Sequence, residues 1–236
     1  MPGGWELSAG DWQIIGLSLK VSAVAMAATL PPAFALAYLL ARKDFFGKSL
    51  VDALVHLPLV LPPVVTGWML LLAFGQNGPI GGWLQSAFGV SVLFRWTGAA
   101  IAAGVMALPL MVRAIRLSIE GVDRRLEGAA RSLGAGAWRT FATITLPLSL
   151  PGVLAALVLG FARSMGEFGA TITFVSNIPG ETETLPIAIY SALQVPGGEG
   201  AVVRLAAIAV ALSLAALILS ERLARRGGGG RRAHGL

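Results

Sequence analysis

The stretch Glu127–Pro147, EGAARSLGAGAWRTFATITLP, decides how this chain folds and what it offers to other proteins. It is a polar, basic and glycine-punctuated segment between long apolar runs. A helix face of small residues comes first, then Gly134, then a second short helical run. It closes on Ile144–Pro147, which we interpret as a stop signal because proline interrupts a helix. In a membrane protein, this pattern predicts an ordered cytoplasmic element with a surface for a partner.

Composition assigns the chain to the membrane proteins. Hydrophobic residues make up 56% of the 236 positions and charged residues 13%, whereas a soluble domain carries about 25% charged residues. The sequence contains no cysteine and two histidines, so disulfides and thiolate or His-rich metal sites are excluded. We therefore predict no metal site and no catalytic residues.

Five segments are apolar for about 20 residues, the length that spans a bilayer. They are Trp12–Leu40, Leu50–Phe74, Thr97–Leu117, Leu150–Val175 and Ala201–Leu219. We predict an all-α membrane protein with five transmembrane helices in one domain, residues 1–221. The remaining residues, 222–236, are predicted to form a basic, disordered cytoplasmic tail.

The distribution of Lys and Arg sets the orientation. Most of the 18 basic residues fall in the Ala41–Ser49 loop, in the third span and the loop after it, and in the tail. The opposite loops, 75–96 and 176–200, contain only Arg95. Because basic residues mark the cytoplasmic side, we predict a periplasmic N-terminus and a cytoplasmic C-terminus. The same distribution argues against nucleic acid as a partner.

The cytoplasmic segment, about residues 120–147, has the signals of two short helices. Asp123 is a suitable N-cap for a helix over 124–133, and Gly134 suits the left-handed residue that follows it. A second short helix starts at Ala137, and Pro147 is expected to end the unit. An apolar stripe at i, i+3/i+4 spacing runs along it: Leu126, Ala130, Leu133 and Ala137. The stripe is compatible with a hairpin on the membrane surface or with docking into a groove, and its small residues favour docking.

This segment resembles the permease subunits of ATP-binding-cassette (ABC) importers. The family pattern is E-A-A, three residues, G, nine residues, then I-x-L-P. It matches Ala129, Ala130, Gly134, Ile144, Leu146 and Pro147; Gly128 stands at the glutamate position, and Glu127 lies one residue early. The resemblance implies that these residues, with Glu127, belong to a coupling helix and loop that dock on the ATPase subunit.

Two further stretches, 40–67 and 163–190, resemble the molybdate branch of that family. The resemblance implies an ABC importer permease bundle in the cell inner membrane, working as a homodimer with two ATPase subunits and a periplasmic molybdate-binding protein. ATP and Mg²⁺ would bind the ATPase, and this subunit would hold no cofactor. Tungstate or sulfate are the alternative substrates.

Polar groups inside the spans are the remaining candidates. Arg163 and Glu167 lie four residues apart on one helix face and are expected to pair. Uncharged donors suit an oxyanion that must be released again, so we predict Ser164, Thr171 and Thr173 as candidates for the translocation path. His56 is interpreted as a packing residue.

Other functions are less compatible with the sequence. No G-x-x-x-x-G-K-[ST] loop is present, so the chain cannot power itself with ATP, and it is not an enzyme on its own. An ion-coupled secondary transporter would show internal repeats, which we do not find. A scaffold that recruits a soluble partner remains a third reading, and co-purification with an ATPase discriminates among the three.

Overall fold

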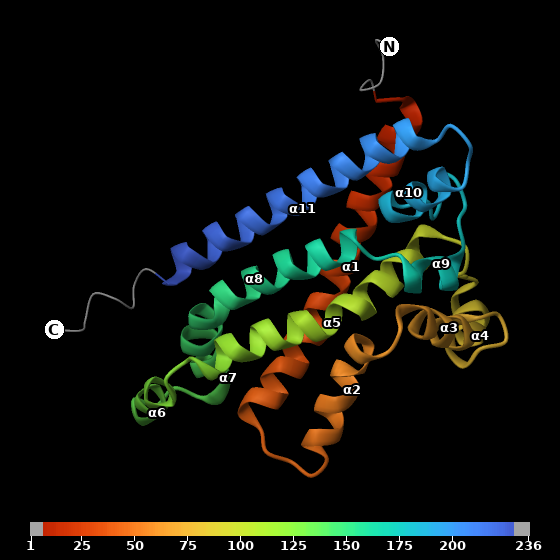
Figure 1. The fold of residues 1–236 in the computed structure, drawn as a ribbon. Helices are drawn as coiled ribbons and strands as arrows, with labels where there is room; N and C mark the ends of the chain where they lie inside the picture. The colour runs from red at the N-terminus through yellow and green to blue at the C-terminus, as the bar shows by residue number, and fades with distance from the viewer. Residues whose placement is uncertain (1–6, 229–236) are drawn as a thin grey trace.

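The computed structural model describes residues 7–228, except for the side chains of residues 220, 221 and 223–228. Every regular element in that range is a helix (Figure 1). Four helical segments are long and apolar enough to cross a membrane: α1 (Ala9–Arg42), α5 (Trp96–Glu120), the run Ala137–Met165, and Glu199–Leu219 of α11. The bent pair α2 (Lys48–Val60) and α3 (Pro63–Phe74) passes the same test together and makes a fifth span when it is counted as one. The predicted helical membrane fold is thereby confirmed.

The segment that we predicted as the second span, Leu50–Phe74, is sharply bent. Its two halves are bent by 115° relative to each other. Leu61 is extended, with ψ of 142°, as expected for a residue before proline. Pro62 and Pro63 lack the N–H groups that would continue the helix. The hydropathy profile shows no break because both halves are apolar.

The fourth span is displaced from the predicted Leu150–Val175. Helix runs from Ala137 through α7 (Ala137–Thr140), a π-helical turn (Phe141–Thr145) and α8 (Leu146–Met165). The predicted stop at Ile144–Pro147 is therefore wrong, because Pro147 lies in the first turn of α8, where its missing N–H is tolerated. The wide turn before it carries the chain from one α-helical register to the next. After Met165 the helix breaks, and α9 (Gly169–Val175) is separate.

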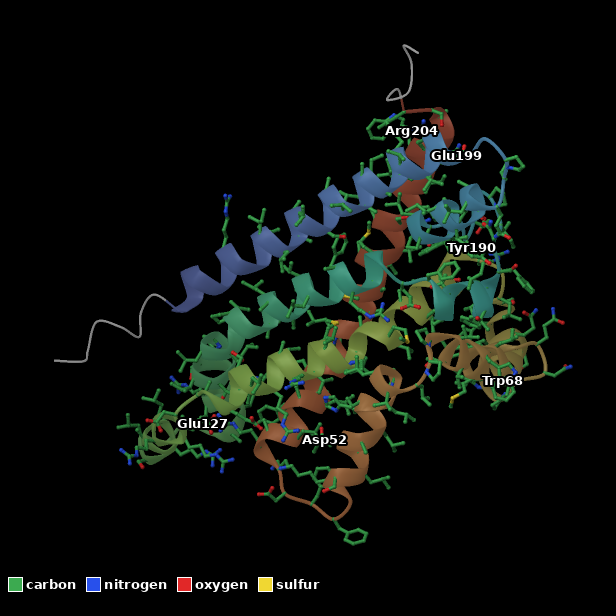
Figure 2. The ribbon with its side chains drawn as sticks, viewed as in Figure 1. Asp52, Trp68, Glu127, Tyr190, Glu199 and Arg204 are labelled. Carbon is green, nitrogen blue, oxygen red and sulfur yellow. The ribbon has the colours of Figure 1, made fainter. Side chains whose placement is uncertain are left out.

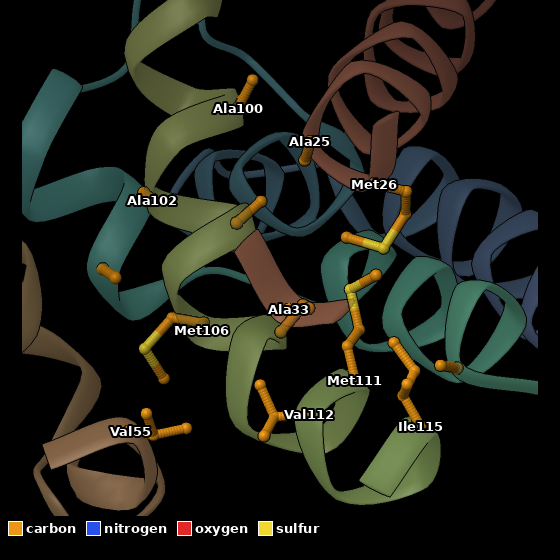
Figure 3. Packing of buried hydrophobic residues seen from close by; sticks show 14 of the residues in the cluster. Ala25, Met26, Ala33, Val55, Ala100, Ala102, Met106, Met111, Val112 and Ile115 are labelled. Atoms are coloured by element: carbon orange, nitrogen blue, oxygen red, sulfur yellow. The ribbon is translucent and has the colours of Figure 1, made fainter. Parts of the chain in front are cut away.

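The core lies where α1, α5 and α8 pack together, and small side chains dominate it. Ala33 and Ala37 of α1 are fully buried, as are Met111, Val112 and Ile115 of α5 (Figure 3). Alanine at such contacts lets helix backbones approach closely, which is how membrane helices gain packing energy without a hydrophobic effect between them.

Short helices occupy the two ends of the bundle. The predicted outer loops contain α4 (Pro79–Phe88) and α10 (Leu185–Leu193), and the cytoplasmic segment contains α6 (Arg124–Ser132), at the opposite end (Figure 1). Helix α11 continues to Gly228, past residue 222, where we placed the start of a disordered tail. The rest of that predicted tail lies outside the described residues.

Candidate functional site

The local conformation of the cytoplasmic segment follows its capping residues. The Asp123 side chain accepts a hydrogen bond from the N–H of Arg125 at 2.8 Å, so this predicted N-cap is confirmed. Helix α6 ends at Ser132, and Gly134 is left-handed with φ of +86°. An L-residue with a side chain would be strained in that conformation. The chain therefore reverses after α6 and enters α7 at a fixed angle.

Apolar side chains of α6 and α7 project into solvent. Leu133 is 90% exposed and Trp138 is 78% exposed. Leu126, Ala129 and Ala137 are exposed as well. We call these five residues the coupling surface. It contains three members of the predicted stripe, whereas Ala130 is only partly exposed. An apolar patch of this kind at the end of a rigid element is typical of a protein-binding surface.

Glu127 points into the molecule instead of joining that surface (Figure 2). Its Oε1 lies 2.9 Å from Nη2 of Arg42 and accepts a hydrogen bond from the Thr145 hydroxyl at 2.7 Å. The side chains of Arg42 and Glu127 are 8% and 13% exposed. One carboxylate thus joins α6 to the end of α1 and to the π-helical turn.

An aromatic cluster makes a second connection between α1 and the cytoplasmic segment. The ring of Phe141, in the π-helical turn, packs edge-on against Phe34 and Tyr38, with centroid distances of 5.9 and 5.4 Å. Trp138 also packs against Phe141, with a centroid distance of 5.5 Å. Phe34, Tyr38 and Arg42 are spaced by four residues and share one face of α1. Sequence reasoning missed this face, because nothing in it distinguishes it from an ordinary packing surface.

The loop between α1 and α2 adds charge at the same end of the bundle. Asp44 pairs with Lys48 at 2.9 Å. The pKa of Asp44 lies below its ordinary value because Lys48 donates this hydrogen bond, and the positive charges of Lys48 and Arg124 add to the effect. The carboxyl group of Asp44 therefore stays ionised, as expected for a segment outside the bilayer.

The remaining members of the predicted motif lie where the segment enters the membrane span. Ile144 is half-buried in the π-helical turn, and Leu146 and Pro147 are exposed at the start of α8. A continuous helix therefore connects α7 of the coupling surface to the fourth span.

The predicted path residues are distributed over two helices. Ser164 of α8 is buried and donates a hydrogen bond to the Ser22 hydroxyl of α1 at 3.0 Å. Thr171 of α9 is buried, and the half-buried Thr173 donates to the Gly169 carbonyl at 2.8 Å. Ser164 therefore holds α8 to α1, and the structure shows no interaction that assigns these three hydroxyls to one site.

Three of the charged residues within the spans, Arg163, Glu167 and Lys20, have partners. Arg163 and Glu167 form the expected ion pair at 2.6 Å, and Glu167 also accepts the N–H of Ala170 at 2.9 Å. This carboxylate thus connects the end of α8 to the start of α9. Lys20 lies with its Nζ 3.7 Å above the ring centroid of Trp96, a cation–π contact between α1 and α5.

Comparison with known proteins gives a consistent result. Residues 33–227 match the family described as binding-protein-dependent transport system inner membrane component. The molybdenum transport system permease protein ModB of Haemophilus influenzae is 61% identical over 90% of this chain and 93% of its own length. ModB of Escherichia coli K12 is 58% identical, over 91% and 94%. A sulfate transport system permease, CysT of Escherichia coli K12, is 34% identical over 80% of this chain and 69% of its own length.

Solved structures confirm the fold at lower identity. A bacterial alginate ABC transporter in complex with its periplasmic protein superposes with a TM-score of 0.69 at 19% identity, covering 93% of this chain and 80% of that one. The MetNI methionine ABC transporter superposes with a TM-score of 0.65 at 16% identity, over 92% and 93%. The helix arrangement is therefore that of ABC importer permeases.

Proposed function

Since this chain belongs to the family of inner membrane components of binding-protein-dependent transport systems, we propose that it is the permease subunit of an ABC importer that carries molybdate across the inner membrane. Its identity to ModB proteins over nine-tenths of both chains carries the choice of substrate. Tungstate and sulfate remain secondary candidates, the latter because of the weaker similarity to a sulfate permease.

The partners follow from what this chain lacks and what it exposes. It has no phosphate-binding loop, so ATP and Mg²⁺ bind a separate ATPase. The coupling surface, defined above, is left uncovered by the rest of the chain, which supports docking to that ATPase. A second copy is the partner that we propose for the exposed apolar residues of α2 and α3. They include Val60, Val64, Trp68, Met69 and Leu72.

The predicted motif residues divide into different roles in this proposal. Ala129, on the exposed face, contacts the ATPase, and Ala130 beside it is less exposed. Gly134 sets the angle between α6 and α7. Glu127 acts as a positioning residue inside the permease, since its carboxylate is already engaged by Arg42 and Thr145. Ile144, Leu146 and Pro147 form the junction through which motion reaches α8.

The substrate proposal predicts a specific growth phenotype. Deleting this subunit should abolish high-affinity uptake of radiolabelled molybdate, and high external molybdate should restore molybdoenzyme activity through other routes. Sulfate uptake should stay nearly unchanged. A deletion strain that required reduced sulfur but kept normal molybdoenzyme activity would overturn the choice of molybdate. ATP hydrolysis by the co-purified ATPase, stimulated by loaded binding protein, is the second measurement.

The charge distribution predicts the orientation of the chain. Because the chain has no cysteine, single cysteines can be introduced at exposed positions in opposite loops, Lys43→Cys and Glu181→Cys. An impermeant thiol reagent applied from the periplasmic side should label the cysteine at 181 and not the one at 43. Labelling only at 43 would show the reverse orientation.

A further inference from the structure

A groove between α2 and α5 contains a cluster of charged side chains that the coupling surface does not use. Its volume is about 340 Å³, and its lining consists of Asp52, His56, Arg113, Arg116, Leu117 and Glu120. All of these except Leu117 are ionisable, and they lie on the inner halves of their spans under the orientation proposed above. Figure 2 shows Asp52 on α2 beside α5.

One guanidinium in the groove contacts both of its carboxylates. Nη1 of Arg116 lies 3.1 Å from Asp52, and its Nε lies 2.8 Å from Glu120. Nδ1 of His56 lies 2.8 Å from the Asp52 carbonyl oxygen and 3.3 Å from its carboxylate. Hence the acidic groups of the groove are already engaged by neighbouring residues.

Arg113 is exposed, and it differs from the other charged residues of the groove because it makes no hydrogen bond or ion pair within the part of the chain that the structure describes. It lies one helical turn from Arg116 on α5, so both guanidinium groups border the same groove. The groove thus contains two arginines and two carboxylates, Asp52 and Glu120, and its formal charge is zero when His56 is neutral.

The chemistry of the groove indicates what it faces. Five ionisable groups on one face of two adjacent helices would be costly against lipid hydrocarbon, so the groove faces water or the interior of the assembled transporter. By contrast, α11 exposes Val203, Val210, Leu214 and Leu217, as a lipid-facing helix does. The groove is therefore a polar surface, in contrast to the apolar surface of α11.

We propose that this groove is a weak binding site for a tetrahedral oxyanion at the inner end of the path, with Arg113 as its ligand. This inference rests on the proposed function, because it takes the transported molybdate to be the occupant. A guanidinium binds such oxyanions through charge-assisted hydrogen bonds. The carboxylates held by Arg116 keep the local charge low, which allows the dianion to leave. A lipid phosphate group shares this chemistry and is the alternative source.

The test measures molybdate binding directly. The permease–ATPase complex, without nucleotide or binding protein, is placed in phosphatidylcholine nanodiscs, and the ⁹⁵Mo NMR line width of added molybdate is recorded. Binding to the wild-type complex should broaden the line beyond its width for free molybdate. This excess broadening should be about tenfold smaller with Arg113→Gln, because charge-assisted hydrogen bonds are lost. Arg113→Lys should keep part of it. Lys43→Gln, which removes an exposed positive charge from the α1–α2 loop, should leave it unchanged.

The remaining outcomes each contradict the proposal. Equal broadening by Arg113→Gln and wild type would overturn it, as would an equal loss in Lys43→Gln. If broadening disappeared when the nanodiscs contained phosphatidylglycerol, a lipid head group would be the occupant. Uptake by the deletion strain is measured independently, so a wrong substrate would be recognised there. Each variant is first shown to assemble with the ATPase, which excludes misfolding as the cause.

Discussion

Replacing Glu127 with alanine is expected to abolish most molybdate transport while the protein still inserts into the membrane. The change leaves the guanidinium of Arg42, whose side chain is 8% exposed, without its carboxylate, and removes the acceptor of the Thr145 hydroxyl. Breaking a buried ion pair by removing one partner costs roughly 3–5 kcal/mol. The loss of stability falls on the contact that holds α6 to α1. The coupling surface would remain present but would no longer be fixed to the span that it has to move.

The measurement is the number of molybdate ions moved per ATP hydrolysed in proteoliposomes containing the ATPase and loaded binding protein. Glu127→Ala should lower this ratio strongly, whereas Glu181→Ala, which removes an exposed acid from the loop between α9 and α10, should leave it unchanged. A double variant, Arg42→Met with Glu127→Met, replaces the ion pair by apolar packing, which is often neutral for stability. Recovery of the ratio in the double variant would indicate that the connection matters more than its charges. A normal ratio in Glu127→Ala would contradict the positioning role.

The local structure of the cytoplasmic segment could be predicted from the sequence because capping is a short-range effect. The Asp123 cap and the left-handed Gly134 each depend on residues within a few positions. The helix predicted over 124–133 is observed as Arg124–Ser132. Charge and apolar length likewise predicted the helical membrane bundle, since the bilayer imposes a minimum span length on every segment.

Other features depend on interactions that a single sequence does not display. Arg42, the partner of Glu127, is 85 positions away along the chain. The family pattern suggested a contact of Glu127 with the ATPase, whereas the structure shows this internal contact. The bend at Pro62 and the π-helical turn before Pro147 change direction without changing hydropathy. The groove of Arg113 is formed by α2 and α5, which only the fold brings together.

Replacing Gly67 with alanine should destabilise the protein more than any comparable change at an open glycine. A Cβ atom at Gly67 would lie 2.5 Å from the carbonyl oxygen of Ala170 and 2.9 Å from its Cα. Because these are backbone atoms, α3 and α9 have to move apart. Overpacking of this kind costs about 1–3 kcal/mol, and the contact is where the bent second span meets the short helix after α8.

Gly16→Ala is the matched control, because a Cβ atom there meets nothing within 4 Å. Its effect on stability should not exceed about 1 kcal/mol, the difference in helix propensity between the two residues. Thermal unfolding of the detergent-solubilised permease should show a lower Tm for Gly67→Ala, by several degrees, and little change for Gly16→Ala. Equal Tm values for the two variants would mean that α3 and α9 separate easily. Their close packing would then be a property of one conformation of the transporter, and not a fixed contact on which the fold depends.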